Sequence, residues 1–397
     1  MKNARPPIDE SRAVAHLLDL LRLEGLGGQE RRVAQRLRAK LVEAGCPPET
    51  IRFDDAAERL GPGFETGNLI VCLPGTLPAP RILFSAHMDV VPLCRNAEPI
   101  LRGERIVSAG KTGLGGDDRT GCAAMVVLAE TLLRNDLPHP PLVLLFLVAE
   151  EGGLHGSRMV RPEDLDHPVM GFNLDGQTPD EVVVGAMGAV RWTATLHGRS
   201  SHAGLAPEQG VSAGLAGSMA VAEIAERGYF GKIEIDGRRG TSNLGRIEGG
   251  EASNQVMDLA LFSGECRSHD PAFLEEIVRV HREAFEGAAR RVRNVRGRCA
   301  SLQFDVVSDY RAFRLADAEP CVRLAGEALR ATGLPPRPVV MDAGLDANNL
   351  NEKGIPTVTL GTGTHEFHTI DEFVAVPEYL ACCANLLHVV RLAPGFE

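Results

Sequence analysis

Two adjacent glutamates at the end of a short apolar run are the first residues in this sequence that could do chemistry. Residues 144–149 are apolar, Glu150 and Glu151 follow them, and Gly152-Gly153 comes next. A short continuous apolar run is typical of a parallel strand buried on both faces, and such strands bind ligands at their carboxyl ends. Adjacent strand residues point to opposite faces, so both carboxylates can serve one site only if the strand ends there and the backbone turns. The glycine pair allows that turn, and the alternative is a solvated strand end.

Histidines and further acidic residues follow other predicted strands. His87 and Asp89 lie at the end of one strand, Asp175 ends a second, and His368 comes after a third. Asp117 stands between a glycine-rich loop and a predicted helix. Like charges at this density would repel one another and raise one another's pKa, and a centre of two divalent metal ions removes that cost. Imidazole and carboxylate ligands suit zinc, with cobalt or manganese as alternatives.

Each of these residues also has a structural interpretation when taken alone. His87 could be a core histidine, Asp117 fits the N-cap of the following helix, and Asp175 precedes a glycine in a common turn signal. His365 lies close to His368 and offers a competing imidazole, which we expect to be solvated or to support a ligand. The combination of these residues, rather than any single one, favours a metal centre.

The elements that must position these residues indicate an α/β protein of two domains. Predicted helices and strands alternate up to about residue 186, and the same pattern returns from residue 312. Between them, residues 187–311 read as β-α-β-β-α-β, an α+β domain inserted into the first. We therefore expect a catalytic domain formed by residues 1–186 and 312–397, and an inserted domain at 187–311. The predicted helices cover residues 11–23, 29–44, 119–134, 211–227, 271–292, 320–332 and 377–392, and the predicted strands cover residues 68–73, 81–91, 144–148, 169–175, 182–196, 241–248, 255–267, 299–307 and 357–360.

The composition excludes several classes of protein. A net charge of −11 without an aromatic-interleaved Lys/Arg stripe argues against nucleic acid as a partner. No window approaches 18 apolar residues, so we expect no membrane span. Nine cysteines without regular spacing do not form a disulfide framework, and residues 1–10 carry no secretory signal, so we expect a cytoplasmic protein. Two motifs are incomplete: Arg105 stands where a phosphate-binding loop ending at 110–112 needs glycine, and the histidines at 365 and 368 are too close for a thermolysin-like zinc site.

The same motifs, in this order and spacing, resemble those of the M20 metallopeptidases, and most closely the peptidase T-like branch of aminotripeptidases. The resemblance covers nearly the whole chain. It implies a zinc-exopeptidase-like α/β catalytic domain with an inserted lid or dimerisation domain. The motifs are Ser85-Ala86-His87-Met88-Asp89, Leu114-Gly115-Gly116-Asp117-Asp118, Ala149-Glu150-Glu151-Gly152, Leu174-Asp175-Gly176, Gly344-Leu345-Asp346-Ala347-Asn348 and Phe367-His368-Thr369-Ile370-Asp371-Glu372.

The resemblance assigns the metal ligands to two sites that share one carboxylate. Asp117 would bridge two metal ions, and the peptide bond that follows it would be cis. His87 and Asp175 would complete one site, and Glu151 and His368 would complete the other.

Two further residues of this domain are given roles beside the metals by the resemblance. Asp89 would hold His87 in the required tautomer. Glu150 would be the general base, taking a proton from a water that bridges the metals and passing it to the leaving amine.

The resemblance also assigns three residues of the inserted domain to the substrate. His202 would stabilise the oxyanion, in some relatives across a dimer interface, so a homodimer formed through this domain is a further expectation. Arg267 would bind a substrate carboxylate, and Asn254 would face the substrate. These residues are far in sequence from the metal ligands, so we expect the inserted domain to close over the site.

The implied function is metal-dependent exopeptidase cleavage of small peptides, of the tripeptide aminopeptidase kind. Two alternatives stay open. One is an M20 amidohydrolase or carboxypeptidase that acts on N-acyl amino acids or on C-terminal residues. The other is a relative that binds ligands without catalysis. Arg267 does not distinguish an aminopeptidase from an amidohydrolase or carboxypeptidase, because enzymes of both classes bind a substrate carboxylate.

Overall fold

The structure is a computed structural model that describes residues 8–395, and within them the chain forms two compact units. The larger unit comprises the residues up to Gly185, Arg314–Met341 and the residues from Leu345 on; the inserted unit comprises Ala186–Phe313 and Asp342–Gly344. We predicted the insertion at 187–311. Residues 1–10, in which we predicted no secretory signal, lie mostly outside the described residues. No helix among residues 8–395 is long and apolar enough to cross a membrane.

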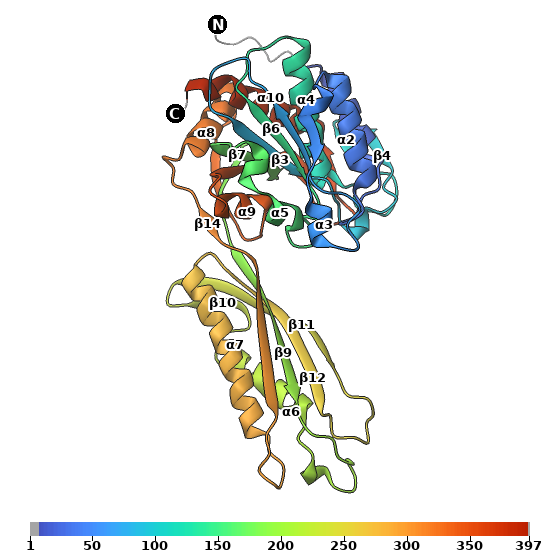
Figure 1. The fold of residues 1–397 in the computed structure, drawn as a ribbon, viewed down its shortest axis with the longest axis vertical. Helices are drawn as coiled ribbons and strands as arrows, with labels where there is room; N and C mark the ends of the chain where they lie inside the picture. Colours follow the sequence, from blue (N-terminus) through green and yellow to red (C-terminus); the bar gives the residue numbers. More distant parts are fainter. Residues whose placement is uncertain (1–7, 396–397) are drawn as a thin grey trace. The chain divides into compact units, whose positions relative to one another are not determined.

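A mixed nine-stranded sheet organises the larger unit, with the order β1-β2-β6-β3-β7-β16-β8-β14 and β15 paired to β8. The central strands β6, β3, β7 and β16 are parallel to one another (Figure 1). The strands are β1 (Ile51–Phe53), β2 (Leu69–Leu73), β3 (Ile82–His87), β6 (Leu142–Leu147), β7 (Met170–Gly176), β8 (Glu181–Ala186), β14 (Phe313–Arg314), β15 (Arg337–Met341) and β16 (Thr357–Gly361).

Strand β6 is buried on both faces, which confirms the interpretation of its continuous apolar run. Leu142, Leu144 and Phe146 point into the main core, which the helices α1, α2, α4, α8 and α10 share. Val143 and Leu145 point into a second core, which includes residues from the opposite side of the sheet, such as Leu350 of α9. The helices are α1 (Glu10–Leu21), α2 (Arg31–Ala44), α3 (Ala56–Leu60), α4 (Gly116–Arg134), α5 (His155–Met159), α8 (Pro320–Thr332), α9 (Asp346–Glu352) and α10 (Val376–Leu392).

A small four-stranded sheet in the larger unit, with the order β17-β18-β5-β4, carries two of the loops that matter below. Its strands are β4 (Pro99–Arg102), β5 (Arg105–Ser108), β17 (Thr364–His365) and β18 (Phe373–Ala375). The glycine-rich loop 109–115 leaves β5 and leads to α4. The loop 366–372, which contains His368, joins β17 to β18.

The inserted unit is a five-stranded antiparallel sheet, with the order β10-β11-β12-β9-β13, and its core lies between the sheet and two helices (Figure 1). The α/β fold class with two domains is confirmed, but this unit has one strand more than predicted. The missed strand β10 forms a hairpin with β11 around Asp236 and Gly237, which both have positive φ, and this Asp-Gly turn is the signal that could have revealed it. The elements are β9 (Gly188–His197), α6 (Ala213–Glu226), β10 (Gly231–Ile235), β11 (Arg238–Gly249), β12 (Leu259–Ser268), α7 (Pro271–Arg291) and β13 (Ser301–Tyr310).

The strand predicted at 182–196 is in fact two strands that belong to different sheets. β8 ends at Ala186 and pairs with β16, whereas β9 begins at Gly188 and pairs with β12 and β13. The apolar pattern does not reveal the break, because both strands are rich in buried residues and only Met187 separates them.

Candidate metal centre

Asp117 lies between two histidines and presents one carboxylate oxygen to each. The Nε2 atom of His87 lies 3.1 Å from Asp117 Oδ1, and the Nε2 atom of His368 lies 3.3 Å from Asp117 Oδ2. His87 Nε2 also lies 3.8 Å from Asp175 Oδ1, and His368 Nε2 lies 2.9 Å from Glu151 Oε1. The five side chains thus form two histidine–carboxylate pairs joined by one carboxylate, which is the grouping that two ions with a shared ligand require.

Strand ends and loops of the larger unit bring these five residues together. His87 ends β3 and Asp175 lies near the end of its parallel neighbour β7, so the two side chains meet at one edge of the sheet. Asp117 stands at the start of α4, and Glu151 follows β6. One ligand atom each from His87, Asp117 and Glu151 lies within 4.8 Å of the others.

The carboxylates of this cluster favour positively charged neighbours. Burial disfavours the charged imidazole of His87, yet hydrogen bonds to Asp117 and Asp175 raise its pKa well above the usual value. Hydrogen bonds to Asp117 and Glu151 raise the pKa of His368 to about 10. Burial opposes the charge on Asp117, but the two histidines hold the pKa of its carboxyl well below its usual range. In this structure only protons on the histidines balance the charge of the three carboxylates. Together the two imidazoles and three carboxylates form a donor set that fits divalent metal ions.

Glu150 differs from Glu151 although the two are adjacent. Burial raises the pKa of Glu151, and a hydrogen bond from His368 opposes this rise. For Glu150, burial raises the pKa well above the usual value, and the nearby carboxylates of Asp175, Asp346 and Glu151 raise it further. Burial also raises the pKa of Asp175, to about 7, so what distinguishes Glu150 is that it is not one of the five side chains in the two histidine–carboxylate pairs.

The backbone turns at Gly152-Gly153 as predicted, where Gly153 has φ +125° and its amide donates to the Glu150 oxygen at 2.9 Å, but it also turns before the glutamates, at Ala149. Strand β6 ends at Leu147, and Ala149 adopts a left-handed conformation with φ +49°. That conformation costs about 1–2 kcal/mol for a residue with a Cβ. It is held by a hydrogen bond from the Ala149 amide to Glu30 Oε1 at 2.8 Å.

Asp89 secures the same turn with its carboxylate. Oδ1 accepts from the Glu150 amide at 2.9 Å, and Oδ2 accepts from the Glu151 amide at 3.2 Å. His87 Nδ1 lies 3.1 Å from the main-chain oxygen of Asp89 and 3.4 Å from Oδ1. Asp89 therefore contacts His87 as expected, and it also ties this histidine to the two glutamates, which the sequence did not reveal. The buried Glu30 was missed as well, and its loop carries no motif that points to it.

The start of α4 combines two predicted features. The peptide bond between Asp117 and Asp118 is cis, as the resemblance implied. Asp118 supplies the N-cap, because its Oδ1 accepts from the Gly121 amide at 3.0 Å. Its Oδ2 accepts from the His87 amide at 3.2 Å, so Asp118 links the helix start to the end of β3.

In the inserted unit, His202 lies beside the segment that contains Asn254. The main-chain oxygen of Asn254 accepts from the Ala203 amide at 2.9 Å, and both His202 and Asn254 are exposed. His202 Nδ1 accepts hydrogen bonds from the amides of Gly204 and Leu205, each at 3.1 Å. In the neutral imidazole the proton is therefore on Nε2, which is a free donor of the kind that an oxyanion needs.

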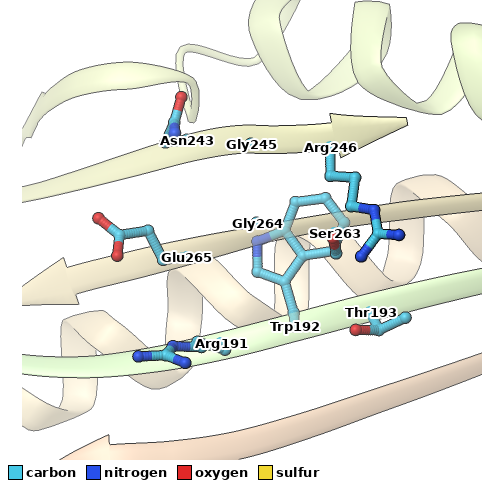
Figure 2. A pocket seen from close by; sticks show the side chains of 9 residues that line it. All are labelled: Arg191, Trp192, Thr193, Asn243, Gly245, Arg246, Ser263, Gly264 and Glu265. Atoms are coloured by element: carbon cyan, nitrogen blue, oxygen red, sulfur yellow. The ribbon is translucent and has the colours of Figure 1, made fainter. Parts of the chain in front are cut away.

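The guanidinium of Arg267 is engaged within the inserted unit. Its Nε and Nη2 atoms donate to the two carboxylate oxygens of Glu265, each at 2.9 Å. Glu265 also lines a shallow pocket of about 370 Å³ on the sheet, together with Arg191, Trp192 and Arg246 (Figure 2). The nine described residues that line this pocket include none of the predicted site residues.

A serine-hydrolase pattern, G-x-S-x-G, occurs at residues 210–214. Ser212 is the N-cap of α6, and its Oγ accepts from the Leu215 amide at 3.1 Å. A nucleophile elbow needs a strand before the serine, and η4 (Pro207–Gln209) precedes this one. The pattern is therefore a helix start.

Comparisons with known proteins identify related peptidases. Residues 83–392 match the peptidase family M20/M25/M40. The aminopeptidase PepT from Bacillus cereus ATCC 10987 is similar in structure, with a TM-score of 0.84 and 31% identity over 97% of this chain and 99% of that one. A tripeptidase from Staphylococcus aureus subsp. aureus mu50 has a TM-score of 0.86 and 28% identity over 98% and 99% of the two chains. Peptidase T from Aeromonas hydrophila subsp. hydrophila is 26% identical over 84% of this chain and 87% of its own.

The family match spans well over half of the chain and includes all five clustered residues, so this protein is a member of the peptidase family M20/M25/M40 and a hydrolase.

Proposed function

We propose that this chain is a dinuclear metal exopeptidase that cleaves small peptides, in the manner of a tripeptide aminopeptidase. The observation that carries the proposal is Asp117, whose two oxygens face two histidines that are each paired with a second carboxylate. The similarity to an aminopeptidase PepT and to a tripeptidase supports the substrate class. All nine cysteines, which lie within the described residues, are free, and this supports a cytoplasmic location.

We assign the proposed ligands to two metal ions according to the two histidine–carboxylate pairs. Asp117 would be shared, His87 and Asp175 would hold one ion, and Glu151 and His368 would hold the other. Zinc is the proposed metal, because histidine nitrogen and carboxylate oxygen are its usual non-sulfur ligands, and cobalt or manganese are the alternatives. When bound, two such ions would polarise the scissile carbonyl and lower the pKa of the attacking water.

The residues of the chain supply the remaining chemistry. Glu150 would accept the proton of the attacking water and deliver it to the leaving amine. His202 would donate from Nε2 to the oxygen that becomes negative. Arg267 would bind the substrate carboxylate only after Glu265 leaves its guanidinium, and Asn254 would contact the substrate.

The proposed assembly is a homodimer formed through the inserted unit. Several large apolar side chains of this unit are exposed, among them Leu205 at 82%, Ile247 at 61% and Leu215 at 55%. Such side chains are candidates for burial in an interface. Light scattering after gel filtration measures the mass directly, and a mass of one chain at micromolar concentration would contradict the dimer.

The function is tested with a tripeptide and its blocked forms. The zinc-loaded protein should cleave a tripeptide such as Ala-Ala-Ala and release the N-terminal residue, while the N-acetylated tripeptide should be cleaved at least about 100-fold more slowly. A chelator should abolish the activity, and zinc should restore it. The Glu150→Gln protein, purified in parallel, is the control for contaminating peptidases. Undiminished cleavage of the N-acetylated peptide would instead indicate an amidohydrolase or carboxypeptidase, and no turnover together with no metal uptake would indicate a non-catalytic relative.

A further inference from the structure

The carboxylate of Glu372 is buried, and four consecutive backbone amides surround it. The residue is 3% exposed. Its Oε2 accepts from the amides of Leu114 at 2.6 Å and Gly115 at 2.9 Å. Its Oε1 accepts from the amides of Gly116 at 2.7 Å and Asp117 at 3.2 Å. The last of these amides belongs to the residue that we propose as the shared metal ligand.

The glycine-rich loop is shaped to receive this carboxylate. Gly115 has φ +81°, a conformation that favours glycine. A Cβ at Gly113 would lie 2.7 Å from Cys94 Sγ and 3.1 Å from Glu372 Oε2, and a Cβ at Gly116 would lie 2.8 Å from Val374. The glycines therefore allow the loop to wrap the carboxylate closely, and they explain why this loop is rich in glycine.

Glu372 joins two segments that the metal centre needs together. It lies four residues after His368, in the loop between β17 and β18, whereas Asp117 begins α4 some 250 positions earlier in the chain. His368 is in a left-handed conformation with φ +63°, which needs support from the surrounding structure, and its side chain is 47% exposed. The strong anchor of this loop to the α4 start is the set of four charge-assisted hydrogen bonds to Glu372.

We propose that Glu372 is a positioning residue of the metal centre. Its carboxylate sets the placement of the Asp117 backbone relative to the loop of His368, so that the two side chains can hold the same ion. This inference rests on the proposed metal centre. Replacing a residue that orients a metal ligand typically lowers the metal affinity about 10–100-fold.

The test is the Glu372→Gln variant, measured in the full chain by direct titration of the metal-free protein with zinc. Glutamine has nearly the same shape, but its amide group places hydrogens against two of the four backbone N–H groups, so about half of the acceptor capacity is lost. We expect zinc affinity to fall about 10–100-fold. We also expect hydrogen exchange of residues 114–117 to be faster in the metal-free variant than in the metal-free wild type. If this variant does not fold, Glu372→Asp, which keeps both acceptor oxygens, is measured in its place.

The matched control is Glu130→Gln, the same change at a buried carboxylate that lies on α4 itself. Glu130 accepts from Arg12 Nε and contacts His16 Nε2, each at 3.1 Å, and it lies roughly 18 Å along the helix from Asp118 at 1.5 Å per residue. We expect this variant to be less stable to heat, with a zinc affinity within twofold of wild type.

The outcomes separate this inference from the proposed function. Wild-type protein that takes up no zinc would contradict the metal centre itself. Wild-type protein that binds two zinc ions, with Glu372→Gln binding them within twofold as tightly, would contradict the positioning role alone. An equal loss of affinity in Glu372→Gln and Glu130→Gln would also contradict it, because the effect would then follow stability and not position.

Discussion

The unequal roles of the two adjacent glutamates are open to a direct test by two isosteric variants. Glu150→Gln removes the group proposed to carry the proton. Glu151→Gln removes a proposed ligand that lies 2.9 Å from His368. Both changes neutralise one carboxyl group and keep the side-chain volume, so each variant is the control for the other.

The expected magnitudes follow from the surroundings of each side chain. General-base catalysis contributes about 10²- to 10⁴-fold, so Glu150→Gln should lower kcat by that factor, or about 3–5 kcal/mol in the barrier. Because burial and, to a smaller extent, neighbouring carboxylates oppose the charge of Glu150, the loss of that charge should leave the thermal stability of the metal-free protein unchanged or raised. Glu151→Gln breaks a contact with His368, which is 47% exposed, so its stability cost should stay below about 1 kcal/mol. Zinc affinity at one of the two sites should fall at least 10-fold.

The assay combines zinc content, measured after dialysis against a fixed free-zinc concentration, with the initial rate of tripeptide cleavage. Glu150→Gln should keep two zinc ions and lose turnover. Glu151→Gln should keep one zinc ion, and added zinc should recover part of its activity. Equal loss of metal from both variants would refute the assignment within the pair, and so would a Glu150→Gln enzyme with more than one-tenth of the wild-type kcat.

Two other variants test the supporting structure. In the Asp89→Asn variant the side chain cannot accept hydrogen bonds from both the Glu150 and the Glu151 amide, so we expect the free energy of unfolding to fall by about 1–3 kcal/mol and zinc to bind about 10–100-fold more weakly. Thermal unfolding measures the first effect and titration with zinc measures the second. Wild-type values in both assays would show that the turn does not depend on Asp89. In the inserted unit, burial lowers the pKa of His281 from 6.5 to about 4, so His281 is neutral in the folded state. The folded state therefore loses up to about 3 kcal/mol as the pH falls from 6.5 to 4, and this loss is absent above pH 6.5. Urea unfolding followed by the fluorescence of Trp192, which lies 5.3 Å from His281 and is the only tryptophan, should show this slope in wild type and a smaller one in His281→Leu; equal slopes would refute the assignment.

Local patterns in the sequence were sufficient for the long helices and the central strands, but not for short elements such as α3, α5, α9 and the four strands of the small sheet. The apolar run of β6 predicted a strand buried on both faces, and its alternate residues do enter two cores. The pattern was insufficient at Met187, where two strands of different sheets follow each other, and at β10, which is short and lies at the sheet edge. In both places hydrophobicity is a local property, whereas the choice of partner strand is not.

The residue types in order along the chain also pointed to the chemistry of the centre, because histidines and acids follow strand ends that a parallel sheet brings to one edge. Only the tertiary structure decided how they are held. Asp89 binds two amides 61 and 62 positions away, and Glu372 binds four amides some 255 positions away. The turn at Ala149 depends on Glu30, which has no place in any motif. In each contact one partner is a backbone amide, a group that nearly every residue carries, so the sequence does not show which amides a distant carboxylate will bind.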